Sequence, residues 1–167
     1  MQGVRIYQIP PCRMVSSGTG MFGDGVLERF NAWFSRQPRG IFPKDFLFWD
    51  GAGFQWLYLY EEGMEVPPEF DIVDFPGGLY AVATDIDGQT DMEALNREVD
   101  AFLEKSGFER DPDRFGLGNI ITPPSVSEIL GYNQMDYYTP IRAKQNRKEP
   151  KLWQWTSLWS KGPESTI

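Results

Sequence analysis

The side chains that could do acid–base chemistry in this chain are carboxyl and phenol groups. Its 167 residues include no histidine and one cysteine, Cys12, so imidazole catalysis, an internal disulfide and a zinc site are excluded. Asp136 and Tyr138 lie two residues apart in QMDYYTPIRA, and this spacing places both side chains on one face of a strand. They are the catalytic candidates, and neither a metal nor a cofactor is expected. Cys12 itself is expected to act as a small hydrophobic side chain.

Aromatic side chains are the candidates for ligand binding. The stretch QWLYLYEEG alternates as a strand does, with Trp56, Tyr58 and Tyr60 on one face and Leu57 and Leu59 on the other. The leucines suit a face covered by helices. The three rings are therefore expected on the uncovered face, lining a cleft where they can stack on an aromatic or cationic ligand.

Two further residues extend this predicted cleft. Glu62 continues the face of the rings and is expected at the cleft mouth, with a solvated strand end as the alternative. In the preceding strand, DFLFWD, either Trp49 or Phe48 faces the same way, and alternation does not decide which. Trp49 is taken as the ligand-binding candidate.

The register of the last strand decides where Asp136 lies. Aligning Gln134 with Gln55 places Asp136 at the position of Leu57, on the face assigned to the helices. Because a lone carboxylate is costly to bury under helices, a shift of one residue is preferred, which places Asp136 and Tyr138 in the cleft. Desolvation among the rings would there raise the pKa of Asp136. The alternative is an edge-strand aspartate that faces solvent.

A repeated order of elements is expected to position these residues. YQIPPCRMVSSG and VDFPGGLYAVATD both predict a strand with a proline corner, and Pro76 follows Pro10 by 66 residues (76 − 10). A helix follows each of them. The first has Asp24 as its N-cap, and the second begins with the capping box Thr90-Asp91-Met92-Glu93, in which Thr90 is the N-cap. Two strands follow each helix, the last pair separated by the loop TPPSVSEILGYN.

The sequence therefore predicts an α+β fold. Duplicated strand-helix-strand-strand units, at about residues 3–66 and 70–144, form an antiparallel sheet with both helices on one face and a ligand cleft on the other. Residues 1–144 make up this domain. Residues 145–167 form a tail with Trp153, Trp155 and Trp159, which is expected to pack on the domain, over one end of the cleft or in a dimer interface.

The composition limits the classes of partner that this protein can have. The net charge of −8 and the pI near 4.6 argue against a nucleic-acid partner, because phosphate binding needs a basic face. No run of about 18 apolar residues predicts a membrane span, and the opening residues MQGVRIYQIP lack the apolar run typical of a signal peptide. A cytoplasmic protein with a small-molecule ligand is expected, and its oligomeric state is left open.

The segments YQIPPCRMVSSG, VDFPGGLYAVATDIDG and DYYTPI, in this order, resemble the GyrI-like small-molecule-binding family over residues 3–144. This family includes effector-binding domains of AraC-type and MerR-type transcription regulators. The resemblance implies a duplicated α+β fold whose central cleft binds hydrophobic, often cationic, aromatic compounds. Asp136, Tyr138 and Pro140 match the acidic-x-Tyr-x-Pro pattern of the closing strand, and Tyr80 matches the ring after the second proline corner.

One departure from the family is clear. Gly116 and Gly118 stand in the penultimate strand where many members carry a glutamate with a nearby tyrosine, which removes one cation-binding carboxylate and is expected to widen the cleft. With no helix-turn-helix segment, a free-standing member is expected. Some such members hydrolyse cyclopropane-containing toxins, so hydrolytic detoxification is a candidate activity. The alternative is a non-catalytic protein that sequesters a compound, or inhibits an enzyme by binding to it.

Overall fold

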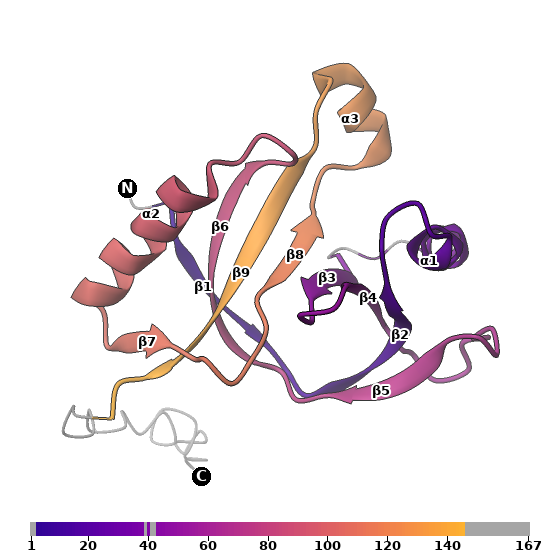
Figure 1. The fold of residues 1–167 in the computed structure, drawn as a ribbon, viewed down its shortest axis with the longest axis horizontal. Helices are drawn as coiled ribbons and strands as arrows, with labels where there is room; N and C mark the ends of the chain where they lie inside the picture. Colours follow the sequence, from indigo (N-terminus) through magenta and orange to yellow (C-terminus); the bar gives the residue numbers. More distant parts are fainter. Residues whose placement is uncertain (1–2, 39, 41–42, 146–167) are drawn as a thin grey trace, which may run out of the picture.

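The computed structural model describes residues 3–38, 40 and 43–145, which form one nine-stranded antiparallel sheet and three helices (Figure 1). The strands are β1 (Arg5–Ile9), β2 (Cys12–Gly20), β3 (Asp45–Trp49), β4 (Phe54–Leu59), β5 (Asp71–Phe75), β6 (Gly78–Ile86), β7 (Phe108–Arg110), β8 (Leu117–Ile120) and β9 (Gln134–Ala143), and the helices are α1 (Val26–Phe34), α2 (Met92–Lys105) and α3 (Pro124–Leu130). The predicted α+β fold with an antiparallel sheet is confirmed. The predicted packing of the Trp-rich tail lies outside the described residues.

The same order of elements occurs twice along the chain. Two strands, a helix and two strands run from β1 to β4 and again from β5 to β9, where β7 and α3 are added. Helix α3 lies within the stretch TPPSVSEILGYN, and Figure 1 shows it projecting beyond one end of the sheet. The strands are ordered β1-β6-β9-β8-β3-β4-β2-β5, and β7 pairs with β9.

The two proline corners lie side by side. Pro10 and Pro11 separate β1 from β2, and Pro76 and Gly77 separate β5 from β6, since proline has no N–H for a ladder. On one side of the corners β1 pairs with β6, and on the other side β2 pairs with β5, in a single continuous register. Gly77 has a positive φ of 68°, and a Cβ there would overlap the chain at the first corner.

Helices α1 and α2 cover the same face of the sheet. Residues directly opposite each other on neighbouring strands share a face. Such pairs link Tyr137 to Gly118, Gly118 to Leu47 and Leu47 to Trp56. Tyr137 packs with the residues of α2, and Trp56 contacts Phe34 of α1. The predicted placement of both helices on one face is therefore confirmed.

Local signals start the helices. In α2 the N-cap is Asp91, whose carboxylate accepts a hydrogen bond from the Ala94 N–H at 3.0 Å. The predicted N-cap, Thr90, is wrong by one residue, since its hydroxyl donates to the Ile86 carbonyl at 2.9 Å. In α1 the N-cap is Gly25, so the predicted N-cap, Asp24, is also wrong by one residue, although its carboxylate accepts from the Val26 N–H at 2.8 Å. No helix among the described residues has the length and hydropathy of a transmembrane segment.

The opposite face of the sheet carries an apolar cluster of its own. Its buried members come from both halves of the chain and are Ile9, Met14, Phe46, Leu57, Tyr80, Val82, Leu117 and Tyr138. Cys12 packs at the edge of this cluster, and burial raises the pKa of its thiol. This placement agrees with the expectation that Cys12 is a small hydrophobic side chain.

Candidate functional site

The three predicted cleft rings of β4 lie on the face that α1 covers. The Phe34 ring stacks on Tyr58 with centroids 5.5 Å apart and meets Trp56 edge-on at 5.0 Å. Tyr60 belongs to the same cluster and lies under the Arg13 guanidinium, 4.8 Å from the ring centroid. The prediction that the rings occupy the uncovered face is wrong. Helix α1 is itself rich in rings, so it packs ring against ring and leaves the leucines to the other face.

Asp136 and Tyr138 lie on the uncovered face, with Leu57. The predicted one-residue shift, which separated Asp136 from Leu57, is therefore wrong, because the face of Leu57 is the one that the helices leave uncovered. Asp136 is only 3% exposed, yet both of its carboxylate oxygens are engaged. One accepts from the Arg5 guanidinium, and the other accepts from the Thr84 hydroxyl at 2.5 Å. The predicted setting of rings alone is therefore wrong for Asp136, because β1 brings a cation to it from 131 residues away.

Tyr138 and Tyr80 form a ring cluster beside Asp136. The Tyr138 ring meets Tyr7, Phe46 and Tyr80 edge-to-face, with centroids 6.1, 5.5 and 6.0 Å away. Burial, and secondarily the Asp136 charge, raises the pKa of the Tyr138 phenol. Both phenols are therefore neutral at physiological pH and can act only as hydrogen-bonding groups or acids.

Replacing Asp136 with Asn is expected to lower the free energy of unfolding by about 1–2 kcal/mol, because the buried position keeps its polar partners but loses a charge-assisted pair. The value is at the low end for a buried pair, since the Arg5 side chain is 51% exposed and screened by water. Urea denaturation measures the loss. Arg5→Met should cost more, because it leaves the buried Asp136 carboxylate without its cation. The double variant Asp136→Asn/Arg5→Met should show a coupling of about 0.5–1 kcal/mol. Strictly additive losses would contradict the pairing.

A groove of about 610 Å³ opens on the helix-covered face, between α2 and the β3–β4 hairpin, whereas the cleft was expected on the uncovered face; we call it the central groove. Both halves of the chain line it. From α2 come Met92, Leu95 and Asn96; from the hairpin come Leu47, Phe48, Trp49 and Phe54; the remainder is supplied by residues 110–112, 114, 116–118, 135 and 137–140. Of the predicted site residues, Trp49 and Tyr138 belong to this lining, although the Tyr138 ring packs on the other face.

The groove floor holds the two glycines of the penultimate strand. A Cβ at Gly118 would overlap the terminal methyl of Met135, and one at Gly116 would lie 3.3 Å from the Tyr138 carbonyl oxygen. The Met135 side chain therefore occupies the space that a larger residue at position 118 would need. The widening predicted for Gly118 is offset by this thioether, which is a soft, mobile apolar surface.

The charged groups of the groove are already paired. Arg114 donates to the Asp111 carboxylate at 2.8 Å, and Arg110 donates to Asp100 at the same distance. Among the groove-lining residues that the structure describes, Asp111 is the only carboxylate. The central groove therefore offers apolar surface and no uncommitted negative charge.

The Arg114 guanidinium lowers the pKa of Asp111, with help from the Asp113 N–H. A carboxyl group whose pKa is lower in the folded than in the unfolded protein stabilises the fold when it is ionised. This stabilisation is complete at pH values above the unfolded-state pKa of about 3.9, and it is lost as the pH falls through the folded-state pKa. The stability difference between wild type and Asp111→Asn, measured by urea unfolding, should therefore be constant from pH 7 to pH 5 and shrink toward pH 3. A difference that does not change with pH would contradict the pairing.

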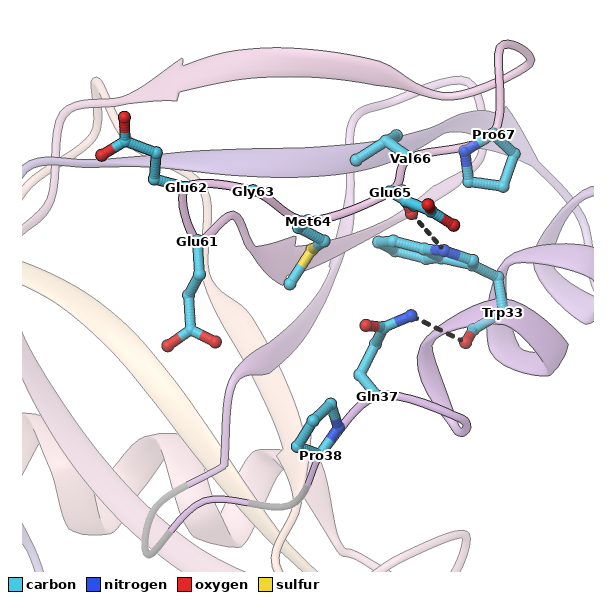
Figure 2. Close-up of a pocket in the computed structure, with 10 residues that line it drawn as sticks. All are labelled: Trp33, Gln37, Pro38, Glu61, Glu62, Gly63, Met64, Glu65, Val66 and Pro67. Carbon is cyan, nitrogen blue, oxygen red and sulfur yellow. Dashed lines mark hydrogen bonds between the residues drawn. The ribbon is translucent and has the colours of Figure 1, made fainter.

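The remaining ligand-binding candidates lie apart. Trp49 is 47% exposed at the groove rim and meets Phe54 edge-on at 5.0 Å. Glu62 lines a different pocket, of about 720 Å³, where the chain after β4 passes the end of α1 (Figure 2). Tyr80 is 2% exposed, with the Arg114 guanidinium 4.8 Å from its ring.

Several residues that line the groove were not predicted from the sequence. Met92 occurs in the sequence analysis only as part of the capping box, yet it is 46% exposed and lines the groove. A methionine in the first turn of a helix is the sequence pattern that could have indicated this groove residue. The pair Asp111 and Arg114, three residues apart outside any predicted helix, gave no such signal.

No protein-family model matches the sequence, and comparison with curated proteins found no match. Several solved structures have a similar fold. The C-terminal domain of EcmrR is 8% identical, with a TM-score of 0.58 over 84% of this chain and 98% of that domain. In the EcmrR–DNA complex, the similar region covers 57% of the EcmrR chain. A hydrolase from Listeria innocua is 11% identical, with a TM-score of 0.59 over 84% of this chain and 92% of the hydrolase. At these identities the likeness concerns the fold, and this chain therefore shares the α+β fold of the EcmrR C-terminal domain and of the Listeria hydrolase.

Proposed function

We propose that this protein binds a flat, apolar aromatic small molecule in the central groove. The observation that carries the proposal is the groove itself, about 610 Å³ in volume and lined by strands from both halves of the chain and by α2. This volume lies within the usual range of about 300–1,000 Å³ for small-molecule sites. The resemblance to the GyrI-like family and the fold shared with the C-terminal domain of EcmrR point in the same direction.

Exposed apolar side chains at the groove support this proposal. Trp49 and Met92 line it and are 47% and 46% exposed. Phe115 is 55% exposed and stacks on the lining residue Phe48, with centroids 5.3 Å apart. Clustered exposed apolar groups commonly mark a binding surface, because a ligand that covers them removes their area from water.

The charges favour a neutral ligand over a cation. Cationic compounds are typical for the family that the sequence resembles, but here Gly118 replaces a larger side chain and Asp111 is held by Arg114. A cation in the groove would meet arginines before it met an available carboxylate. A neutral aromatic compound gains the same apolar contacts without this opposition.

The neutral fluorescent amine N-phenyl-1-naphthylamine tests the proposal. Its emission should rise on binding, and the double variant Trp49→Ala/Met92→Ala should weaken the affinity about tenfold, since roughly 1.4 kcal/mol of apolar contact is lost. The matched control is Ile129→Ala, which removes an 85% exposed side chain on α3, away from the groove. Equal affinities of wild type and the groove variant would contradict the proposal.

Hydrolysis of a strained electrophile is the second candidate function. It is favoured by the Tyr138 phenol next to Asp136 and by a Listeria hydrolase of similar fold; the reaction would take place at Tyr138, whose ring packs on the face opposite the central groove. The substrate would be a cyclopropane conjugated to a carbonyl. Water would attack a ring carbon, the strained C–C bond would break, and a hydrogen bond from the phenol would stabilise the enolate until it takes the proton that the water releases. Loss of the substrate chromophore measures turnover. Tyr138→Phe should abolish turnover while N-phenyl-1-naphthylamine still binds. If the wild type binds the substrate without turning it over, the hydrolase function is ruled out and the protein only sequesters the compound.

A further inference from the structure

We propose that the pocket at the end of α1 is a second binding site, for an organic cation with a quaternary ammonium group. This α1-end pocket has a volume of about 720 Å³, and the described residues that line it are Trp33 of α1, Gln37 and Pro38 after the helix, and residues 61–67 after β4 (Figure 2). It shares no lining residue with the central groove. The proposal is therefore independent of the function proposed for that groove.

A fixed indole forms one wall of the α1-end pocket. The Trp33 Nε1–H donates to the Glu65 carbonyl at 3.2 Å, which ties the helix end to the loop. Behind it the ring contacts Phe30, Tyr58 and Phe70 at centroid distances of 5.4, 5.8 and 5.7 Å. The ring is thus held in one orientation, with Gln37 and Met64 beside it in the pocket (Figure 2). A preorganised tryptophan face is the strongest aromatic partner for a cation.

The charge at this wall is negative. The charged side chains that line the pocket are Glu61, Glu62 and Glu65. Both oxygens of Glu61 accept from Lys44 at 2.8 Å, so this carboxylate is neutralised. Among the residues that the structure describes, Glu62 and Glu65 form no ion pair. The pocket therefore combines an aromatic face with two carboxylates, which attracts cations and repels anions.

The arrangement fits an organic cation better than a metal ion. No three metal-ligating side chains within the described ranges converge closely enough to hold a metal. The surrounding surface is instead soft and apolar, with Met64, Val66, Pro38 and Pro67 around the indole. A weakly hydrated ammonium with methyl or aryl substituents can use this surface and the carboxylates at once, whereas a hard metal ion needs several close oxygen ligands.

Two isosteric probes test the proposal by NMR of the full chain. Phenyltrimethylammonium is expected to shift the Trp33 indole N–H signal, assigned with Trp33→Phe, and the backbone amides of residues 61–66. Its neutral carbon isostere, tert-butylbenzene, should bind at least about fivefold more weakly, since it lacks the cation–π and carboxylate attraction. Glu62→Gln/Glu65→Gln keeps the shape of the pocket and should weaken the cation by about fivefold or more. The matched control, Glu69→Gln, changes an exposed carboxylate that does not line the pocket and should bind as wild type does.

Each alternative outcome overturns the second site. Equal binding of the two probes, or an unchanged affinity in the double glutamine variant, would show that the charge plays no part. If Trp49→Ala removes binding of phenyltrimethylammonium, the cation occupies the central groove and the α1-end pocket is not its site. Loss of N-phenyl-1-naphthylamine binding in that same variant, with the cation still bound, would support both sites separately.

Discussion

Replacing Arg114 with Met is expected to lower the free energy of unfolding by about 3–5 kcal/mol, the range for breaking a largely buried ion pair from one side. The Arg114 side chain is 18% exposed and pairs with Asp111, and its guanidinium also donates to the carbonyl oxygens of Gly77, Leu79 and Ile141. Methionine fills part of the volume but removes the guanidinium donor from three carbonyl groups and leaves the Asp111 carboxylate with the Asp113 N–H alone. The urea midpoint, followed by circular dichroism, measures the loss.

A matched control separates this network from surface charge. Arg142 pairs with Glu109 at 2.9 Å but is 43% exposed, so Arg142→Met should cost less than about 1 kcal/mol. Lys at position 114 should recover only part of the loss, because one ammonium cannot reproduce the planar fork of donors. If Arg114→Met and Arg142→Met cost the same, the guanidinium does not hold the second proline corner together.

Phe30→Ala is the second change with a large expected effect, also about 3–5 kcal/mol, because it empties a site in the core under α1. Phe30 is 0% exposed and contacts Trp33, Phe34 and Phe70 at centroid distances of 5.4, 5.7 and 5.0 Å. Unfolding measured by circular dichroism gives the stability. Near-ultraviolet circular dichroism should also weaken, since Trp33 loses the ring that fixes its orientation.

The control for Phe30 is another phenylalanine of the same region. Phe22 is 59% exposed and makes one ring contact, with Phe54 at 5.3 Å, so Phe22→Ala should cost less than about 1 kcal/mol. The folded fraction of Phe30→Ala should also bind phenyltrimethylammonium more weakly than wild type. A similar, small loss for both variants would mean that α1 is not anchored by its ring cluster.

Sequence patterns predicted the elements well because their signals are local. The proline corners, the helix that follows each of them and the alternation of β4 each depend on residues a few positions apart, and the structure confirms all three. The N-cap of α2 was missed by one position because Thr90 and Asp91 are both good N-cap residues. Alternation also identified correctly that Asp136 and Tyr138 share a face.

What could not be predicted is which face each set of side chains meets. Period-two alternation separates Trp56 and Tyr58 from Leu57 and Leu59, but it carries no information on where a helix will pack. The Arg5–Asp136 pair joins residues 131 positions apart, and only the sheet order brings β1 near β9 through β6. The α1-end pocket likewise forms only because the end of α1 packs beside the chain after β4.

The continuous register through the two corners implies that the halves of this chain exchange their strands. Strand β1 pairs with β6 alone and places Val4 in the core under α2, while β5 pairs with β2 alone and follows Phe70 in the core under α1. Neither half can complete its own sheet, so the molecule is built like a strand-swapped dimer fused into one polypeptide. A chain cut between β4 and β5 should therefore yield two fragments that fold only together.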